Sequence, residues 1–251
     1  MERKILIDAD IVAFKAASAA EKPINWGDGL WTLHAYEDEA KSICMDYFHN
    51  VVSKLSEDDD ENHLHLFLTG GTNWRKDVLP TYKGNRKDTR KPIVLQALRE
   101  WMVSDLGATI EEPFEADDLL GIESTLNGGI IVSEDKDLNT IPGLIFNPAK
   151  DTAPREVSVF DADYNHMMQT LTGDVTDGYP GCPTVGPKKA EAILKGCTTV
   201  SEMWEKVVEA YSKQKLSEEV ALTQARVARI CRIEDINRET MEVKLWTPPA
   251  S

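Results

Sequence analysis

Acidic side chains recur in four short clusters, most of them next to an apolar, strand-like run. The clusters are KILIDAD (residues 4–10), EADD (115–118), SEDKD (133–137) and GDVTD (173–177). Carboxylates gathered at one edge of a sheet repel one another and raise one another's pKa unless a cation lies between them. Oxygen ligands without thiolate or imidazole favour Mg²⁺ or Mn²⁺ over zinc. The pattern predicts a metal-dependent phosphodiesterase.

The first two clusters also have structural explanations. Asp8 serves equally well as a metal ligand or as a helix cap, and Asp10 is the better candidate for the cap of a helix over residues 11–20. Glu115 and Asp118 are three residues apart and share one face of a helix that begins there, whereas Asp117 projects elsewhere. Acids are common in a first helical turn because they complement the helix dipole, so this cluster alone is ambiguous.

The other two clusters are ambiguous for a different reason. Asp135 and Asp137 leave a strand on the same side of the chain, but this spacing is also common in turns. Asp174 and Asp177 lie in a loop rich in glycine and proline, where aspartate often forms turns. Four such clusters in this order favour a metal site over four unrelated structural roles.

Basic residues are concentrated in one strip of an otherwise acidic chain, whose net charge is −15. The strip contains Arg75, Lys76, Lys83, Arg86, Lys87, Arg90 and Lys91. A local positive charge in an acidic protein is typical of a track for nucleic-acid phosphates. Further along, GCPTVGPKKAEAIL (181–194) predicts a glycine-rich turn that leads into a helix. Its amides, with Lys188 and Lys189, could hold a DNA phosphate without reading sequence, although a plain turn–helix junction is the alternative.

Strand-like runs at residues 4–7, 63–68, 129–132 and 144–146 alternate with helical patterns at 37–55, 93–106 and 116–126. This order predicts an α/β fold with a mostly parallel sheet flanked by helices, and 157–160 is a weaker strand candidate. Asp8, Asp135 and Asp137 then fall beyond the carboxyl ends of the strands, where such sheets bind ligands. We expect a nuclease core over 1–160 and a helical region over 161–251. Four of the tryptophans (Trp26, Trp31, Trp101 and Trp204) are expected to be packing residues.

The four cysteines are far apart and form no CxxC pair, which favours reduced thiols in the cytoplasm. No run of 18 uncharged apolar residues occurs, so we expect a soluble protein with no membrane partner. A monomer is expected.

With these motifs in hand, the chain resembles the 5′-nuclease superfamily of flap endonucleases and phage exonucleases. The resemblance covers roughly residues 4–195 and rests on ILIDAD, NWRKDVLPTYKGNRK, EADD, SEDKDL, GDVTDGYPG and VGPKKA in this order. The strip around NWRKD looks most like the exonucleases of short-tailed, T-odd-type bacteriophages. The implied fold is a nuclease core with a helical arch near 82–105 and a helix–turn–helix-type duplex clamp.

The resemblance also implies roles for individual residues. One ion would be held by Asp8, Glu115 and Asp117, with Asp118 nearby, and a second by Asp135, Asp137, Asp174 and Asp177. Lys83 and Arg86 would neutralise the scissile phosphate beside Tyr82. Contacts with DNA would come from Arg75, Lys87, Arg90, Gly181, Gly186, Lys188 and Lys189. The expected substrates are duplex DNA with 5′ ends or flaps, together with RNA·DNA hybrids, and the clamp would bind K⁺.

One departure concerns Thr69, Gly70 and Gly71 in LFLTGGTNWR, which stand where the family has an aspartate. Asp10, Thr69 or a water could replace that ligand, and we expect activity to survive because the other carboxylates are present. Two alternatives stay open. One is a DNA-binding protein without catalysis, and the other is an RNA-directed nuclease of the related toxin-like fold, which generally lacks a clamp.

Overall fold

The computed structural model describes residues 3–55, 62–86 and 89–249. Its centre is a five-stranded sheet in the order β4-β1-β5-β6-β7. The strands are β1 (Arg3–Asp8), β4 (Asn62–Phe67), β5 (Ile130–Val132), β6 (Gly143–Phe146) and β7 (Arg155–Val157). The first four run parallel, whereas β7 is antiparallel to β6. The predicted fold class, a mostly parallel sheet flanked by helices, is confirmed.

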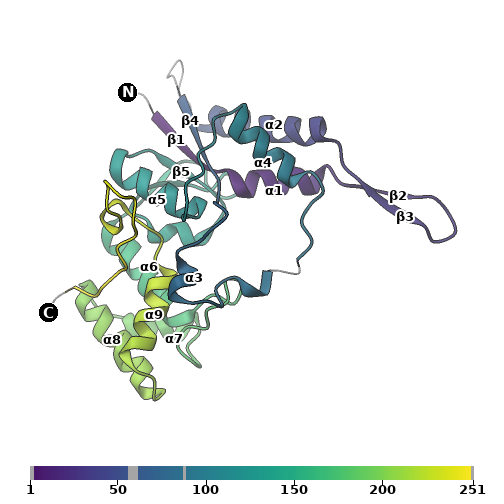
Figure 1. The fold of residues 1–251 in the computed structure, drawn as a ribbon. Coiled ribbons are helices and arrows are strands. Elements are labelled where there is room, and N and C mark those ends of the chain that lie inside the picture. Colours follow the sequence, from purple (N-terminus) through teal and green to yellow (C-terminus); the bar gives the residue numbers. More distant parts are fainter. Residues whose placement is uncertain (1–2, 56–61, 87–88, 250–251) are drawn as a thin grey trace.

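Helices cover both faces of this sheet (Figure 1). On one face lie α1 (Ala9–Ala19), α2 (Glu37–Leu55) and α4 (Leu95–Ser104), and on the other lies α5 (Ala116–Asn127). Successive residues of a strand point to opposite faces, so Ile5 and Ile7 pack in the first core and Leu6 packs against α5. Burial on both faces explains why the central strands have continuous apolar sequences.

The chain after β7 is helical, with its own core. It comprises α6 (Val159–Thr172), α7 (Pro187–Leu194), α8 (Val200–Lys213) and α9 (Glu218–Ala228). Leu171, Trp204 and Tyr211 are buried among these helices. The weaker strand prediction over 157–160 was right only for Val157, the last residue of β7, because Ser158 caps α6 by accepting a hydrogen bond from the amide of Asp161. The division predicted between residues 160 and 161 falls in the first turn of α6 and stays a prediction.

A hairpin of β2 (Lys22–Asn25) and β3 (Trp31–His34) projects from the body beyond α1 (Figure 1). It contradicts the expected packing role of Trp26 and Trp31, whose exposed fractions are 61% and 60%. Trp101 and Trp204 do pack against apolar cores, as predicted.

Among the described residues, the region of the predicted arch contains little helix before α4. After α3 (Arg75–Val78) the chain forms a short 3-10 helix, η1 (Gly84–Arg86), and residues 89–92 contain no helix. Two further 3-10 helices are η2 (Lys136–Thr140) and η3 (Ile233–Asp235). In the part of the chain that the structure describes, no helix is both long and apolar enough to cross a membrane.

Candidate active site

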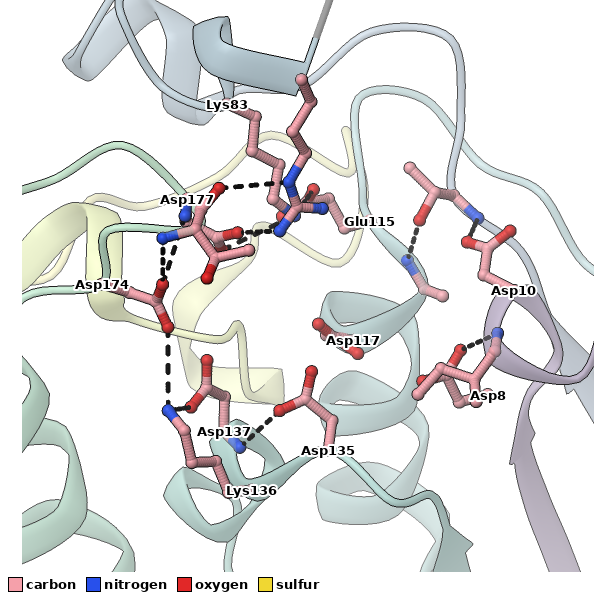
Figure 2. A pocket seen from close by; sticks show the side chains of 15 residues that line it. Asp8, Asp10, Lys83, Glu115, Asp117, Asp135, Lys136, Asp137, Asp174 and Asp177 are labelled. Carbon is pink, nitrogen blue, oxygen red and sulfur yellow. Dashed lines mark hydrogen bonds and ion pairs between the residues drawn. The ribbon is translucent and has the colours of Figure 1, made fainter. Parts of the chain in front are cut away.

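A cavity of about 360 Å³ opens where β1 and β5 end and α5 begins (Figure 2). Eight carboxylates line it: Asp8, Asp10, Glu115, Asp117, Asp135, Asp137, Asp174 and Asp177. Three cations line it as well: Lys83, Arg86 and Lys136. The tertiary structure therefore brings together members of all four acidic clusters and part of the basic strip.

Asp8 ends β1 and caps α1. One of its oxygens accepts a hydrogen bond from the amide of Ile11 (3.3 Å) and the other from the hydroxyl of Ser133 (3.1 Å). The prediction that Asp10 is the better cap was wrong. Burial raises the pKa of Asp8 to about 6, and the nearby charge of Asp135 adds to this effect.

Asp117 faces the cavity from the first turn of α5 (Figure 2). Among the described residues its side chain makes no hydrogen bond or ion pair. Burial raises its pKa well above the ordinary value, and the carboxylates of Asp8 and Asp135 raise it further. A cation between these three carboxylates would favour the charged form of Asp117 and so lower its pKa again.

The loops after β5 and α6 supply the remaining acids. Asp135 caps η2 by accepting from the amide of Asp137 (2.8 Å). Asp174 organises its own loop, accepting from the amides of Thr176 (2.7 Å) and Asp177 (3.2 Å). These bonds fit the turn-forming role considered for both pairs, yet all four side chains also line the cavity.

Lys83 lies between Glu115 at the start of α5 and Asp177 in the loop after α6. Its ammonium group pairs with Glu115 and lies 3.7 Å from Asp177. Its backbone has a φ of 51°, an uncommon value for a residue with a side chain, and its amide donates to the carbonyl of Asp177 (2.7 Å). Burial opposes ionisation of Glu115, but the charges of Arg75 and Lys83 outweigh it and hold the pKa of Glu115 below its ordinary value.

Arg86 lines the cavity beside Lys83, whereas Tyr82, predicted to lie at the scissile phosphate, is buried and does not line it. The Tyr82 hydroxyl lies 2.9 Å from Glu115 and 3.0 Å from Asp177, so it bridges two of the predicted ligands. Arg86 pairs with Asp177 and donates to the carbonyl of Thr176 (3.2 Å). Its side chain is 47% exposed and lines the cavity, so it is accessible to a bound phosphate.

Arg75 and Asp118 have a different role from the one predicted. Arg75 is 2% exposed and Asp118 is fully buried, and two 2.7 Å hydrogen bonds join the guanidinium to the carboxylate. Asp118 also accepts from the amides of Glu115 and Cys231 and from the indole of Trp74. These contacts leave Asp118 without free ligand capacity and Arg75 without access to DNA. The predictions of a metal ligand and a DNA contact at these positions were wrong.

Gly181 is also buried, which contradicts its predicted contact with DNA. It has a φ of 65°, and an added Cβ would lie 2.3 Å from the nitrogen of Gly173. Its amide donates to the side chain of Gln224 (2.9 Å). Gly186, which precedes α7, and Lys188 and Lys189 on its first turn are exposed, as a phosphate contact requires.

The two remaining predicted DNA contacts lie in the arch region. Lys87 falls outside the described residues. Arg90 makes two 2.7 Å hydrogen bonds to Glu21, which precedes the β2–β3 hairpin and also accepts from the amide of Ile93 (2.9 Å). The arch segment is thereby attached to the base of the hairpin.

Thr69, at the position of the departure noted above, supports helix α5 through its side chain. Its hydroxyl accepts from the amide of Ala116 (3.0 Å), and its own amide donates to Asp10 (2.8 Å). Asp10 pairs in turn with Arg99 of α4. Both oxygens of Asp10 are therefore engaged by protein groups.

The donor groups around the cavity are carboxylates, with cationic side chains among them. Within residues 3–55, 62–86 and 89–249, no three Asp, Glu, His or Cys side chains are arranged to hold one ion as they stand. The donor chemistry nevertheless fits a hard divalent cation, because carboxylates outnumber cations around the cavity and the Asp117 side chain has no hydrogen-bond or ion-pair partner among the described residues. Lysine and arginine side chains neutralise part of this charge in the structure, notably Lys136 against Asp137 (2.9 Å).

Several residues of the site escaped the sequence reasoning. Lys136 also lies 3.7 Å from Asp174, and Gln169 of α6 donates to Asp137 (2.7 Å). Ser133 supports both Asp8 and the amide of Asp135. Lys136 and Ser133 stand within the SEDKD motif and could have been suspected. Gln169 carries no local signal, because only the packing of α6 brings it to η2.

Known proteins are similar to this chain in sequence and in fold. The exodeoxyribonuclease of Enterobacteria phage T3 is 29% identical over 97% of this chain and 92% of its own length. The exonuclease of Escherichia phage T7 is 27% identical over 97% and 93%. The phage T5 flap endonuclease, solved in a complex with DNA and metal ions, superposes with a TM-score of 0.61 at 15% identity, covering 90% of this chain and 88% of that one, and this similarity shows the fold.

A family match is more specific than these pairwise similarities. Residues 3–152 match the 5′-3′ exonuclease, N-terminal resolvase-like domain family, so the match includes three of the four acidic clusters and the basic strip. Since it spans more than half of the chain and agrees with both the fold and the phage relatives, the chain belongs to the 5′-3′ exonuclease family.

Proposed function

We propose that this protein is a divalent-metal-dependent 5′-3′ DNA exonuclease and structure-specific 5′ nuclease. The observation that carries the proposal is the convergence of seven predicted ligands in one cavity beneath Lys83 and Arg86. These ligands are Asp8, Glu115, Asp117, Asp135, Asp137, Asp174 and Asp177. The phage T3 and T7 relatives, an exodeoxyribonuclease and an exonuclease by name, support the same activity.

The side chains suggest how a phosphodiester would be held. Arg86 and Lys83 would neutralise the scissile phosphate, exchanging their contacts with Asp177 and Glu115 for contacts with the phosphate oxygens. Tyr82 would keep Glu115 and Asp177 in place during this exchange. A divalent ion held by the carboxylates would supply a nucleophilic water at neutral pH and neutralise the leaving oxygen.

Duplex DNA would be gripped away from the cavity. The amides at the start of α7, with exposed Lys188 and Lys189, suit a phosphate contact that does not depend on sequence. We include duplex 5′ ends and flaps, and the RNA strand of RNA·DNA hybrids, among the substrates. Mg²⁺ or Mn²⁺ at two sites, K⁺ at the clamp, a monomeric state and a role in phage DNA replication and recombination are parts of the same proposal.

The first experiment uses an internally labelled duplex with one blocked 5′ end, incubated with and without Mg²⁺. Mg²⁺-dependent loss of nucleotides from the free 5′ end alone supports the enzyme and its polarity. Asp135→Ala and Asp174→Ala should abolish cleavage and retain DNA binding. If the wild-type protein binds the duplex but cleaves it neither in Mg²⁺ nor in Mn²⁺, the result would instead support the DNA-binding alternative.

Lys83→Ala separates the enzyme from the DNA-binding alternative. In a nuclease it should slow the chemical step strongly, because a cation next to the reacting phosphate stabilises the transition state more than the ground state. In a protein that only binds DNA, the same change should merely weaken affinity. Lys76→Ala is the control, since Lys76 belongs to the same basic strip but does not line the cavity.

A further inference from the structure

Arg99 joins three parts of the fold at the edge of the carboxylate cavity. It lies on α4, and its guanidinium pairs with Asp10 at the start of α1. It also donates to the carbonyl of Thr69, just beyond β4. Arg99 itself lines a neighbouring cavity, whereas Thr69 lines both cavities.

Thr69 passes this connection on to α5. The amide of Thr69 donates to the second oxygen of Asp10 (2.8 Å), so Arg99, Asp10 and Thr69 form a closed set of contacts. The Thr69 hydroxyl accepts from the amide of Ala116 (3.0 Å), the first residue of α5. The helix start that carries Asp117 is thus tied to the helix start that carries Asp8.

We propose that Arg99 is a positioning residue for the carboxylate site. Through Asp10 and Thr69 it fixes the beginning of α5 relative to the end of β1, and it links both to the helix that follows the arch. The same contacts keep Asp10 paired with an arginine, which leaves the seven other carboxylates for the ions. This inference rests on the proposed nuclease function for its kinetic consequence and on geometry alone for its structural one.

An ordinary surface ion pair would behave differently. The side chains of Arg99 and Asp10 are 21% and 27% exposed, and pairs open to solvent contribute little to stability. If Arg99 and Asp10 form only such a surface pair, its removal should leave the cleavage rate and the hydrogen exchange of the first turn of α5 nearly unchanged. If Arg99 instead contacts DNA directly, its removal should weaken DNA affinity, whereas Asp10→Asn should have no effect.

A double-mutant cycle distinguishes these cases. Arg99→Ala and Asp10→Asn should each lower the single-turnover cleavage rate by about tenfold, since small misplacements of catalytic groups are costly. The double variant should be no slower than either single variant, because both changes break one connection, and the Kd for duplex should stay within about twofold of the wild type. Arg99→Lys should recover only part of the rate, because lysine keeps the positive charge but lacks the planar guanidinium that can contact Asp10 and Thr69 together.

Lys41→Ala is the matched control. Lys41 also pairs with an acid, Glu37, and lies over the ring of Trp101 of α4, yet it does not line the carboxylate cavity. Its removal should leave the cleavage rate unchanged. A hundredfold loss in the double variant, the product of two independent tenfold effects, would overturn the proposal, as would a raised Kd at an unchanged rate.

Hydrogen exchange tests the geometry without requiring activity. Amides in the first turn of α5 should exchange faster in Arg99→Ala and Asp10→Asn than in the wild type or Lys41→Ala, because the partner of the Ala116 amide loses its support. If the wild-type protein cleaves nothing, the proposed function fails but this measurement still decides the inference. Unchanged exchange in both variants would refute it.

Discussion

Replacing Arg75 by methionine tests a fully buried ion pair of the core, Arg75–Asp118. The substitution removes two 2.7 Å hydrogen bonds to Asp118 and leaves that fully buried carboxylate without its counter-charge. It also removes donors to the carbonyls of Val227 and Arg229, through which α3 holds the end of α9.

The expected loss of stability is large. Removing one partner of a buried ion pair costs about 3–5 kcal/mol. In a protein of this size each 1 kcal/mol corresponds to roughly 2–4 °C in Tm, so Arg75→Met should melt about 6–20 °C below the wild type. Asp118→Asn in the Arg75→Met background should recover part of the loss, because it removes the uncompensated charge and keeps a side-chain oxygen for the donors that Asp118 accepts from.

Urea unfolding followed by circular dichroism measures these changes, with Arg86→Met as the matched control. Arg86 is also paired with an aspartate, but its side chain is 47% exposed, so its loss should cost less than about 1 kcal/mol. The salt dependence of DNA binding provides a second readout: the slope should fall in Arg86→Met and stay constant in Arg75→Met. A stable Arg75→Met protein with a reduced slope would refute the assignment of Arg75 to the core.

Three further predictions concern the cavity, the clamp and pH. Asp117→Asn should raise the Tm of the metal-free protein, because burial and the neighbouring carboxylates disfavour the charge of Asp117. The same substitution should abolish the stabilisation by Mn²⁺, and thermal melts with and without Mn²⁺ measure both effects. Gly181→Ala should destabilise the protein in urea by more than about 1 kcal/mol, because the Cβ would clash with Gly173, whereas Gly196→Ala, with open space, should cost less. Burial lowers the pKa of His166 to about 3, so below about pH 6.5 the unfolded chain binds a proton at His166 that the folded protein does not bind. Between pH 7 and pH 5 the wild type should therefore lose about 2 kcal/mol more stability than His166→Asn. Equal losses in the two proteins would contradict this.

The carboxylate site was accessible to sequence reasoning because its signals are local. Asp8 and Asp135 follow apolar runs that form β1 and β5, and parallel strands deliver their carboxyl ends to the same edge of a sheet. The hairpin was missed although its signal is local too. NWGDGLW contains a turn with positive φ at Gly27, Asp28 and Gly29, and the two strands beside it are only four residues long, too short for a clear alternation of apolar and polar side chains.

What the sequence by itself determined is the fold class, the order of the acidic clusters and the family pattern, since each depends on residues close together in the chain. Only the tertiary structure decided which charges serve the core. Arg75 and Asp118 look like a DNA contact and a ligand until α9 covers them, with partners more than a hundred residues away. Burial is a property of the assembled fold, and it converts a charge from a binding group into a packed ion pair.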